Sequence, residues 1–384
     1  EISSLTINEN HYIPERQLNN NTYQLGNGLF RNNLKLRFLQ DIAESGTALL
    51  LYRPEFAYNY YDGLLGGISI ANSSILANTF RFKFSPQYGV KRKQISGLGF
   101  LIADFYKENS SHYLTRINLF GSSFHYAPQL RYTVFTPSLI FYYRPKGIQN
   151  KQRSSLQIQH VSVRLDDLPE SDERRGYGVS LASFQSRKGT ALDNFSYKAE
   201  AQVASNFKKL SLNAEYITYY APNRRWTMRV FAGTFLSNNA NDNYYDFNVS
   251  RVNDYLFQHD LYGRSEAEGF FSQQYIKAEG ALRTTGNLTS ANQWLMTAQS
   301  ATTIWRWVEG YAEIGWVKSM HQNAETHWGT GITFNLVPDF FEVHFPTYNS
   351  NGTVFTNNAY PKNIRFQLSL RPASLAKLFS RSWF

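Results

Sequence analysis

Alternation between apolar and polar side chains recurs along this chain in segments of six to nine residues. Between residues 195 and 203, Phe, Tyr, Ala and Val side chains fall on one face of an extended chain, and Ser, Lys, Glu and Gln fall on the other. The same rhythm recurs at 80–85, 210–216, 328–336 and 363–370. Successive side chains of a strand point to opposite faces. Each segment therefore predicts a strand with one apolar face, in either a soluble sandwich or a membrane barrel.

Strand length and aromatic placement favour the membrane barrel. Many of the expected strands exceed ten residues, whereas strands of soluble proteins average about 5–6 residues. Aromatic residues gather at segment ends, as in Tyr58-Asn59-Tyr60-Tyr61, Phe141-Tyr142-Tyr143 and Tyr219-Tyr220, as in the aromatic girdles of membrane barrels. Apolar runs such as Ala48 to Leu51 are far shorter than the ~18 residues of a membrane helix, and the mean hydropathy of −0.44 fits alternating strands.

The predicted fold is therefore all-β, a transmembrane antiparallel barrel of about sixteen strands. Residues 1–48 are expected to form an N-terminal periplasmic tail or linker, 49–371 the barrel, and 372–384 a C-terminal periplasmic tail. The strands are expected at 49–60, 63–72, 79–90, 94–106, 112–126, 130–145, 151–166, 174–187, 193–205, 208–220, 224–236, 293–303, 304–317, 324–336, 338–347 and 362–371. The chain begins at Glu1, which suggests a mature chain or a fragment.

One segment, 237–292, is too long for an ordinary turn and is rich in Asn, Asp, Tyr and Gly. Long loops in compact folds are usually functional. The segment follows the eleventh expected strand and contains Gly263-Arg264-Ser265-Glu266. On the strand near 304–317, alternation places Glu313 on the polar face, opposite Ala312 and Ile314.

The last 180 residues or so resemble the barrel of the outer-membrane assembly-factor and surface-antigen superfamily. That resemblance implies a loop folded into the lumen, whose arginine meets an acidic residue on strand thirteen. The expected lumen pair is therefore Arg264 with Glu313, supported by Gly263, Ser265 and Glu266, because a guanidinium binds a carboxylate through two parallel hydrogen bonds. The chain departs from the family pattern, since Gly263 precedes the arginine and Glu replaces Asp. Phe366, Leu368 and Leu370 resemble the closing-strand signal of that superfamily.

A narrower resemblance covers almost the whole chain. Four segments are similar to the C-terminal barrel of Bacteroidota surface proteins that carry a gluzincin, aminopeptidase-like metallopeptidase domain. They are Tyr60-Tyr61-Asp62-Gly63-Leu64, Ser123-Phe124-His125-Tyr126-Ala127-Pro128, Gly263-Arg264-Ser265-Glu266 and Phe271-Ser272-Gln273-Gln274. This resemblance implies a soluble domain before Glu1.

The residues predict no catalytic, cofactor or metal site within the chain. His-Glu-x-x-His, Gly-x-Ser-x-Gly and phosphate-loop motifs are absent. The net charge of +10 is dispersed, apart from small clusters such as Lys91-Arg92-Lys93, so nucleic acid is not an expected partner. The expected partners are outer-membrane lipids and lipopolysaccharide, together with outer-membrane proteins or a fused surface domain.

Three functions remain open at this point. The barrel anchors, and helps export or assemble, a surface domain, or it is a subunit of an outer-membrane assembly or translocation complex. Alternatively, it is a passive diffusion porin with a basic lumen. In the third hypothesis it is the membrane anchor of a zinc metallopeptidase whose catalytic domain lies outside this chain.

Overall fold

The structure is a computed structural model of the chain. It describes residues 4–8, 12–13, 21–24, 33–39, 47–73, 78–147, 150–166, 168, 172–190, 192–240, 242–284, 289–337, 340–356 and 360–368. Among these residues, no helix is both long and apolar enough to cross a membrane. The leading part of the chain has short strands β1 (Ser4–Thr6), β2 (Thr22–Gln24) and β3 (Asn33–Phe38).

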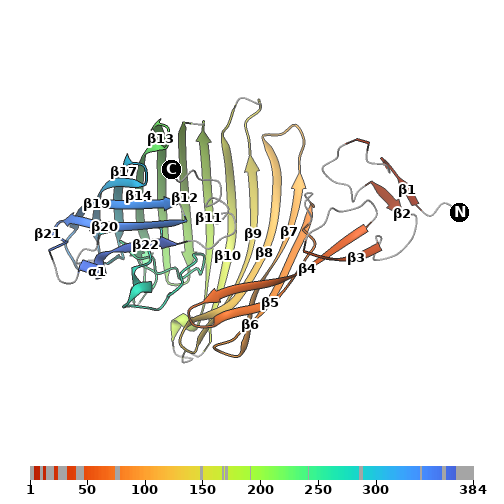
Figure 1. Cartoon of the computed structure of the whole chain (residues 1–384), viewed down its shortest axis with the longest axis horizontal. Helices are drawn as coiled ribbons and strands as arrows, with labels where there is room; N and C mark the ends of the chain where they lie inside the picture. The colour runs from red at the N-terminus through yellow and green to blue at the C-terminus, as the bar shows by residue number, and fades with distance from the viewer. Residues whose placement is uncertain are drawn as a thin grey trace. The chain divides into compact units, whose positions relative to one another are not determined.

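Long strands make up most of the described chain (Figure 1). They are β4 (Thr47–Asn59), β5 (Gly63–Ala71), β6 (Phe80–Gly89), β7 (Gln94–Tyr106), β8 (His112–Ala127), β9 (Leu130–Tyr143), β10 (Arg153–Leu165), β11 (Gly176–Gly189), β12 (Asp193–Ala204), β13 (Phe207–Ala221), β14 (Arg224–Asn238), β17 (Trp294–Trp305), β18 (Val308–Lys318), β19 (Glu325–Val337) and β20 (Phe341–Asn349). The short elements are η1 (Glu173–Arg175), β15 (Phe247–Asn248), η2 (Phe270–Gln273), β16 (Ser290–Ala291), β21 (Gly352–Thr353), α1 (Tyr360–Asn363) and β22 (Arg365–Leu368).

The chain divides into two compact units. Unit 1 comprises residues 1–108, 114–140 and 162–176, and unit 2 comprises 109–113, 141–161 and 177–384. In unit 1, β4 to β8 form an antiparallel meander, and β3 adds to β4 in parallel. In unit 2, β11 to β14, β17 to β20 and β22 form an antiparallel meander, with the long loop (residues 239–293) inserted after β14.

The sheet of unit 1 has its charged side chains sheltered and its apolar side chains exposed. Asp104 is buried between Arg81 (2.8 Å) and Arg116 (2.6 Å), and Lys83 Nζ lies 2.7 Å from Glu55 Oε1. The opposite face exposes large apolar side chains, among them Phe56, Leu64, Phe84, Ile95 and Phe105. A soluble sheet places its apolar face inward instead. Hydrocarbon around the apolar face accounts for this distribution.

Unit 2 shows the same distribution. The inner face, defined as the face against which the long loop packs, buries Lys209, Arg229, Gln299, Glu313 and His344. The outer face exposes a band of large apolar side chains. They include Phe195, Leu210, Leu212, Met228, Met296, Trp316, Trp328, Ile332 and Phe334. The alternation in the sequence therefore separates the two faces as predicted.

Most strands lie within a few residues of their expected positions. The expected strand 94–106 coincides with β7, and the expected strands 193–205 and 224–236 correspond to β12 and β14. The expected closing strand 362–371 is shorter in the described residues, where α1 precedes a four-residue β22. The segment expected as an N-terminal tail contains β1, β2 and β3. The expected C-terminal tail, 372–384, lies outside the described residues.

Candidate functional site

The candidate site consists of the long loop and the inner face of unit 2 beneath it. The loop leaves β14, pairs with itself through β15 and β16, and contacts the strands β13, β14, β17 and β18 and the last strand β22. Its apolar side chains fill space against the sheet: Phe247 and Leu282 pack with Phe231, Leu295 and Val317. The loop therefore occupies the inner face of these strands as part of the packed structure.

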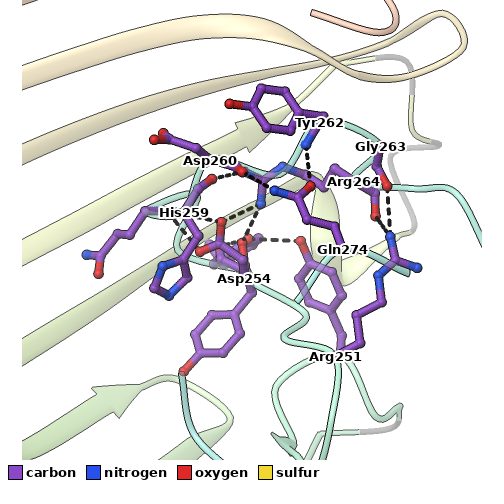
Figure 2. Close-up of polar contacts among 12 residues, drawn as sticks. Arg251, Asp254, His259, Asp260, Tyr262, Gly263, Arg264 and Gln274 are labelled. Carbon is purple, nitrogen blue, oxygen red and sulfur yellow. Dashed lines mark hydrogen bonds and ion pairs between the residues drawn. The ribbon is translucent and has the colours of Figure 1, made fainter. Parts of the chain in front are cut away.

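Arg264 organises one turn of this loop (Figure 2). Its Nη1 donates to Asp254 Oδ2 at 2.6 Å, and its Nη2 donates to the His259 carbonyl at 2.9 Å. The Asp254 carboxylate also accepts the backbone N–H groups of Gln258 and His259, at 2.8 and 2.9 Å. The guanidinium carbon lies 4.6 Å from the Phe257 ring centroid. Arg264 thus closes the turn 254–259 through a buried ion pair and a cation–π contact.

A second arginine holds the segment that carries Arg264. Arg251 donates to the carbonyls of Gly263 (2.7 Å), Arg264 (3.3 Å) and Glu266. Figure 2 shows Arg251 and Gly263 facing each other across the loop. A Cβ on Gly263 would lie 2.3 Å from Phe271 Cβ, so only glycine fits there. Ser265 is exposed.

The loop also reaches the last described strand. Gln274 accepts the Tyr262 N–H at 2.9 Å and donates to the Asp260 carbonyl at 2.8 Å (Figure 2). The next residue, Tyr275, donates its N–H to the Phe366 carbonyl at 2.6 Å. Phe270 stacks on the Phe366 ring, with centroids 4.2 Å apart. Phe366, predicted as part of a closing signal, is therefore buried under the loop, while Leu370 lies outside the described residues and Leu368 is half-buried.

Three side chains of the sheet bind the backbone of the loop. Arg229 donates to the carbonyls of Glu279 (2.6 Å) and Gly280 (3.4 Å). Thr297 and Gln299 donate to the Gly280 carbonyl at 3.0 and 2.9 Å. Buried carbonyls need such donors, because an unpaired buried polar group costs about 1–3 kcal/mol. The inner face therefore provides donors that match the path of this loop.

Glu313 anchors the loop residues Arg283 and Thr284 to β18. Its Oε1 accepts both the N–H and the hydroxyl of Thr284, each at 2.7 Å, and its Oε2 lies 3.5 Å from Arg283 Nη1. The Arg283 guanidinium carbon lies 4.6 Å from the Tyr311 ring centroid. Glu313 is 4% exposed. One carboxylate thus joins β18 to the loop through three polar contacts.

Lys209 provides a third anchor, on β13. It is 2% exposed, and its Nζ lies 3.1 Å from the Tyr245 carbonyl and 3.6 Å from Glu279 Oε1. The same ammonium lies 4.4 Å from the Phe247 ring centroid and 4.8 Å from that of Tyr255. A buried lysine is stable only when it is paired and solvated by protein groups. All of these groups come from the loop, so Lys209 requires the docked loop.

The predicted pairing of Arg264 with Glu313 needs correction. The carboxylate partner of Arg264 is Asp254, within the loop, and the guanidinium partner of Glu313 is Arg283. The sequence correctly placed Glu313 on the polar face of its strand, where it meets the loop. The partner is different because the loop brings residues 283–284, rather than 263–266, over β18.

Asp254, Arg283, Arg229 and Lys209 were not identified from the sequence. Lys209 precedes the outward-facing Leu210 in an alternating strand. Its inward position, and that of Arg229 beside Met228, could have been read from the same alternation. No local pattern marks Asp254 or Arg283, because their partners depend on the path of the loop.

Asp246 makes the docked loop sensitive to pH. It is 3% exposed, and its Oδ2 accepts a hydrogen bond from Ser290 at 3.2 Å. Burial raises the pKa of this loop carboxyl from 3.8 to about 6. The docked loop therefore keeps a proton between about pH 4 and 6 that a released loop would give up. Its stabilising effect is present below about pH 4 and is lost as the pH rises through 6.

Asp246→Asn is expected to remove this pH dependence. Amide exchange of residues 245–256, followed by mass spectrometry in detergent from pH 4 to 7.5 and corrected for intrinsic exchange, should show less protection above pH 6 in the parent only. At pH 7.5 the variant should be protected by up to about 3 kcal/mol more than the parent, because a shift of one pKa unit corresponds to about 1.4 kcal/mol. Glu268→Gln, at an exposed carboxylate of the same loop, is the matched control. Equal pH profiles for parent and Asp246→Asn would contradict the assignment.

Comparisons with known proteins are limited to structural likeness. No protein-family model and no curated protein matches the chain. CdiB from Acinetobacter baumannii is 12% identical over 78% of this chain and 57% of its own, with a TM-score of 0.37. BamA from Haemophilus ducreyi, in a crystal structure lacking POTRA domains 1–3, is 8% identical over 79% of this chain and 69% of its own, with a TM-score of 0.41. TM-scores this low do not establish a shared family or a shared function.

The fold class follows from the strands themselves. They are mostly nine to sixteen residues long, pair with their neighbours in sequence in antiparallel register, expose apolar side chains and bury charged ones. In hydrocarbon every backbone polar group must be paired within the protein, which restricts spanning strands to barrels. Such barrels occur in outer membranes. The chain is an all-β transmembrane barrel protein of the bacterial outer membrane, with a long loop folded against the inner face of its strands.

Proposed function

We propose that this chain is a non-catalytic barrel that acts in the assembly or export of proteins at the outer membrane. In this role it anchors a surface domain or serves as a subunit of an assembly or translocation complex. The observation that carries the proposal is the docked loop, which is held to the sheet by Lys209, Arg229, Gln299 and Glu313. A passive porin needs an open aqueous lumen, whereas this loop occupies the inner face.

The chain spans 57% of the length of CdiB and 69% of that of BamA, so the activity and partners of the whole protein are part of this proposal. Within this role, we propose that the barrel anchors the metallopeptidase domain of a Bacteroidota surface protein. It is motivated by the motifs Tyr60 to Leu64 and Ser123 to Pro128. In the structure these two motifs meet, since His125 Nδ1 lies 2.5 Å from Asp62 Oδ1.

The test is purification of the full protein from its native outer membrane in mild detergent, followed by mass spectrometry and planar-bilayer recording. The proposal predicts a covalently attached surface domain or a stoichiometric protein partner, together with a silent or weakly conducting barrel. A lone barrel with large, steady conductance would instead support the diffusion porin. A detergent-solubilised unrelated porin from the same membrane serves as the control for the recording.

A further inference from the structure

A basic hairpin tip in unit 1 is not explained by the docked loop. The tip, defined as residues 90–93 between β6 and β7, contains Lys91-Arg92-Lys93. Its backbone is tied to neighbouring turns: Val90 N–H donates to the Leu64 carbonyl and Lys91 N–H to the Asp62 carbonyl, each at 3.0 Å. Lys93 N–H donates to the Gly89 carbonyl at 2.7 Å, and Lys93 has a φ of +56°. The three basic residues therefore stand on a well-defined turn.

The neighbouring acidic residue does not neutralise this tip. Asp62 is fully buried, and its carboxylate accepts hydrogen bonds from Asn59 Nδ2 at 2.8 Å and from the His125 N–H at 3.1 Å. His125 Nδ1 occupies the other oxygen at 2.5 Å. Lys91 and Lys93 are exposed, and Arg92 is partly exposed. The tip therefore presents a concentrated positive charge to its surroundings.

Directly beside the tip, the apolar face of the strands is exposed. Tyr88, Val90, Ile95 and Leu64 are 48%, 60%, 65% and 57% exposed. Tyr88 and Ile95 are cross-strand partners at the end of the β6–β7 pair. Lys91 Nζ lies 5.2 Å from the Tyr60 ring centroid and 3.2 Å from the Tyr60 carbonyl. An apolar belt bordered by tyrosine and basic side chains is the arrangement found where a membrane surface meets water.

We propose that Lys91, Arg92 and Lys93 form a binding site for the phosphate groups of anionic membrane lipids. Lysine and arginine are the usual partners of phosphate, and basic residues beside a membrane span attract anionic headgroups. The apolar side chains beside the tip contact the acyl chains of the same lipid. This inference rests on the membrane-barrel fold and is independent of the docked loop and of any assembly partner.

The test compares lipid binding by the full chain and by the triple variant K91Q/R92Q/K93Q in detergent. Native mass spectrometry titrates phosphatidylglycerol, a lipid with an anionic phosphate, against zwitterionic phosphatidylcholine. The parent should prefer phosphatidylglycerol, and the triple variant should lose affinity for it by at least tenfold and up to about 100-fold. Rising salt should weaken binding to the parent, because salt screens exposed charges.

Two controls make the result decisive. K107Q/K146Q/K151Q removes three lysines from the turns at the other ends of β7 and β9 and should keep the parent's affinity. K91R/K93R keeps the positive charge of the tip and should also keep the parent's affinity for phosphatidylglycerol. Three results would each overturn the proposal. The triple variant could keep the parent's affinity, or the parent could bind phosphatidylcholine as well as phosphatidylglycerol. Inorganic phosphate or an acidic peptide could also compete as strongly as the lipid. Conductance and partner recovery should be the same in parent and triple variant, which separates this test from that of the proposed function.

Discussion

Glu313→Ala is expected to release the end of the long loop and to open a conducting path through the barrel, which we expect to be silent in the parent protein. The substitution leaves the Thr284 N–H and hydroxyl without their acceptor and Arg283 without its carboxylate. Removing one partner of a buried charge pair costs about 3–5 kcal/mol. That cost falls on the docked state alone, because a released loop exposes these groups to water.

Planar-bilayer recording measures the outcome, with protease cleavage of the loop as a second readout. The variant should show frequent openings and faster cleavage near residues 276–284. Glu313→Gln keeps an acceptor for Thr284, so its opening frequency and cleavage rate should lie between those of the parent and of Glu313→Ala. Glu55→Ala is the matched control, since Glu55 lies in β4 of unit 1 and its partners Lys83 and Ser85 lie in β6. If Glu313→Ala stays silent with a fully protected loop, the anchoring role of this carboxylate is wrong.

Gly329→Val is expected to displace the same part of the loop by steric exclusion, with the strands intact. A Cβ at position 329 would lie 2.4 Å from Thr284 Cγ2, 2.5 Å from its Oγ1 and 2.8 Å from its Cβ. Thr284 cannot rotate away without losing its hydrogen bond to Glu313, because a β-branched side chain has few rotamers. Overpacking of this kind costs about 1–3 kcal/mol, which adds to the hydrogen bonds lost when Thr284 moves.

The prediction is checked by conductance and loop cleavage, while heat-dependent gel migration reports whether the barrel is folded. Gly329→Ala adds only the Cβ and should also reduce the protection of the loop. Thr284→Gly removes the three atoms that this Cβ would meet. The double variant Gly329→Ala/Thr284→Gly should therefore regain part of the protection that Gly329→Ala loses. Such rescue separates a steric clash from general damage to β19. Gly121→Ala is the control, because a Cβ there would have only an ordinary contact, 3.7 Å from the Val134 carbonyl. Unchanged loop protection in Gly329→Val would count against the close approach of Thr284.

The positions of most strands could be predicted because lipid acts on every residue of a spanning strand in the same way. The alternation at 94–106 and 193–205 reproduces β7 and β12 within one residue at each end. β3 was missed although Leu34, Leu36 and Phe38 alternate with Lys35 and Arg37. Its six residues are too few to span a membrane, and the parallel pairing with β4 is set by the fold rather than by its own pattern.

The sequence by itself determined most of the long strands and which face their side chains take, including the inward position of Glu313. Only the tertiary structure decided that Asp254 pairs with Arg264, that Arg283 and Thr284 meet Glu313, and that Asp62 meets His125. The physical reason is the range of the interactions. A solvent boundary imposes a two-residue period that is visible locally, whereas the partner of a loop side chain depends on the path of the whole loop across the sheet, which no local pattern records.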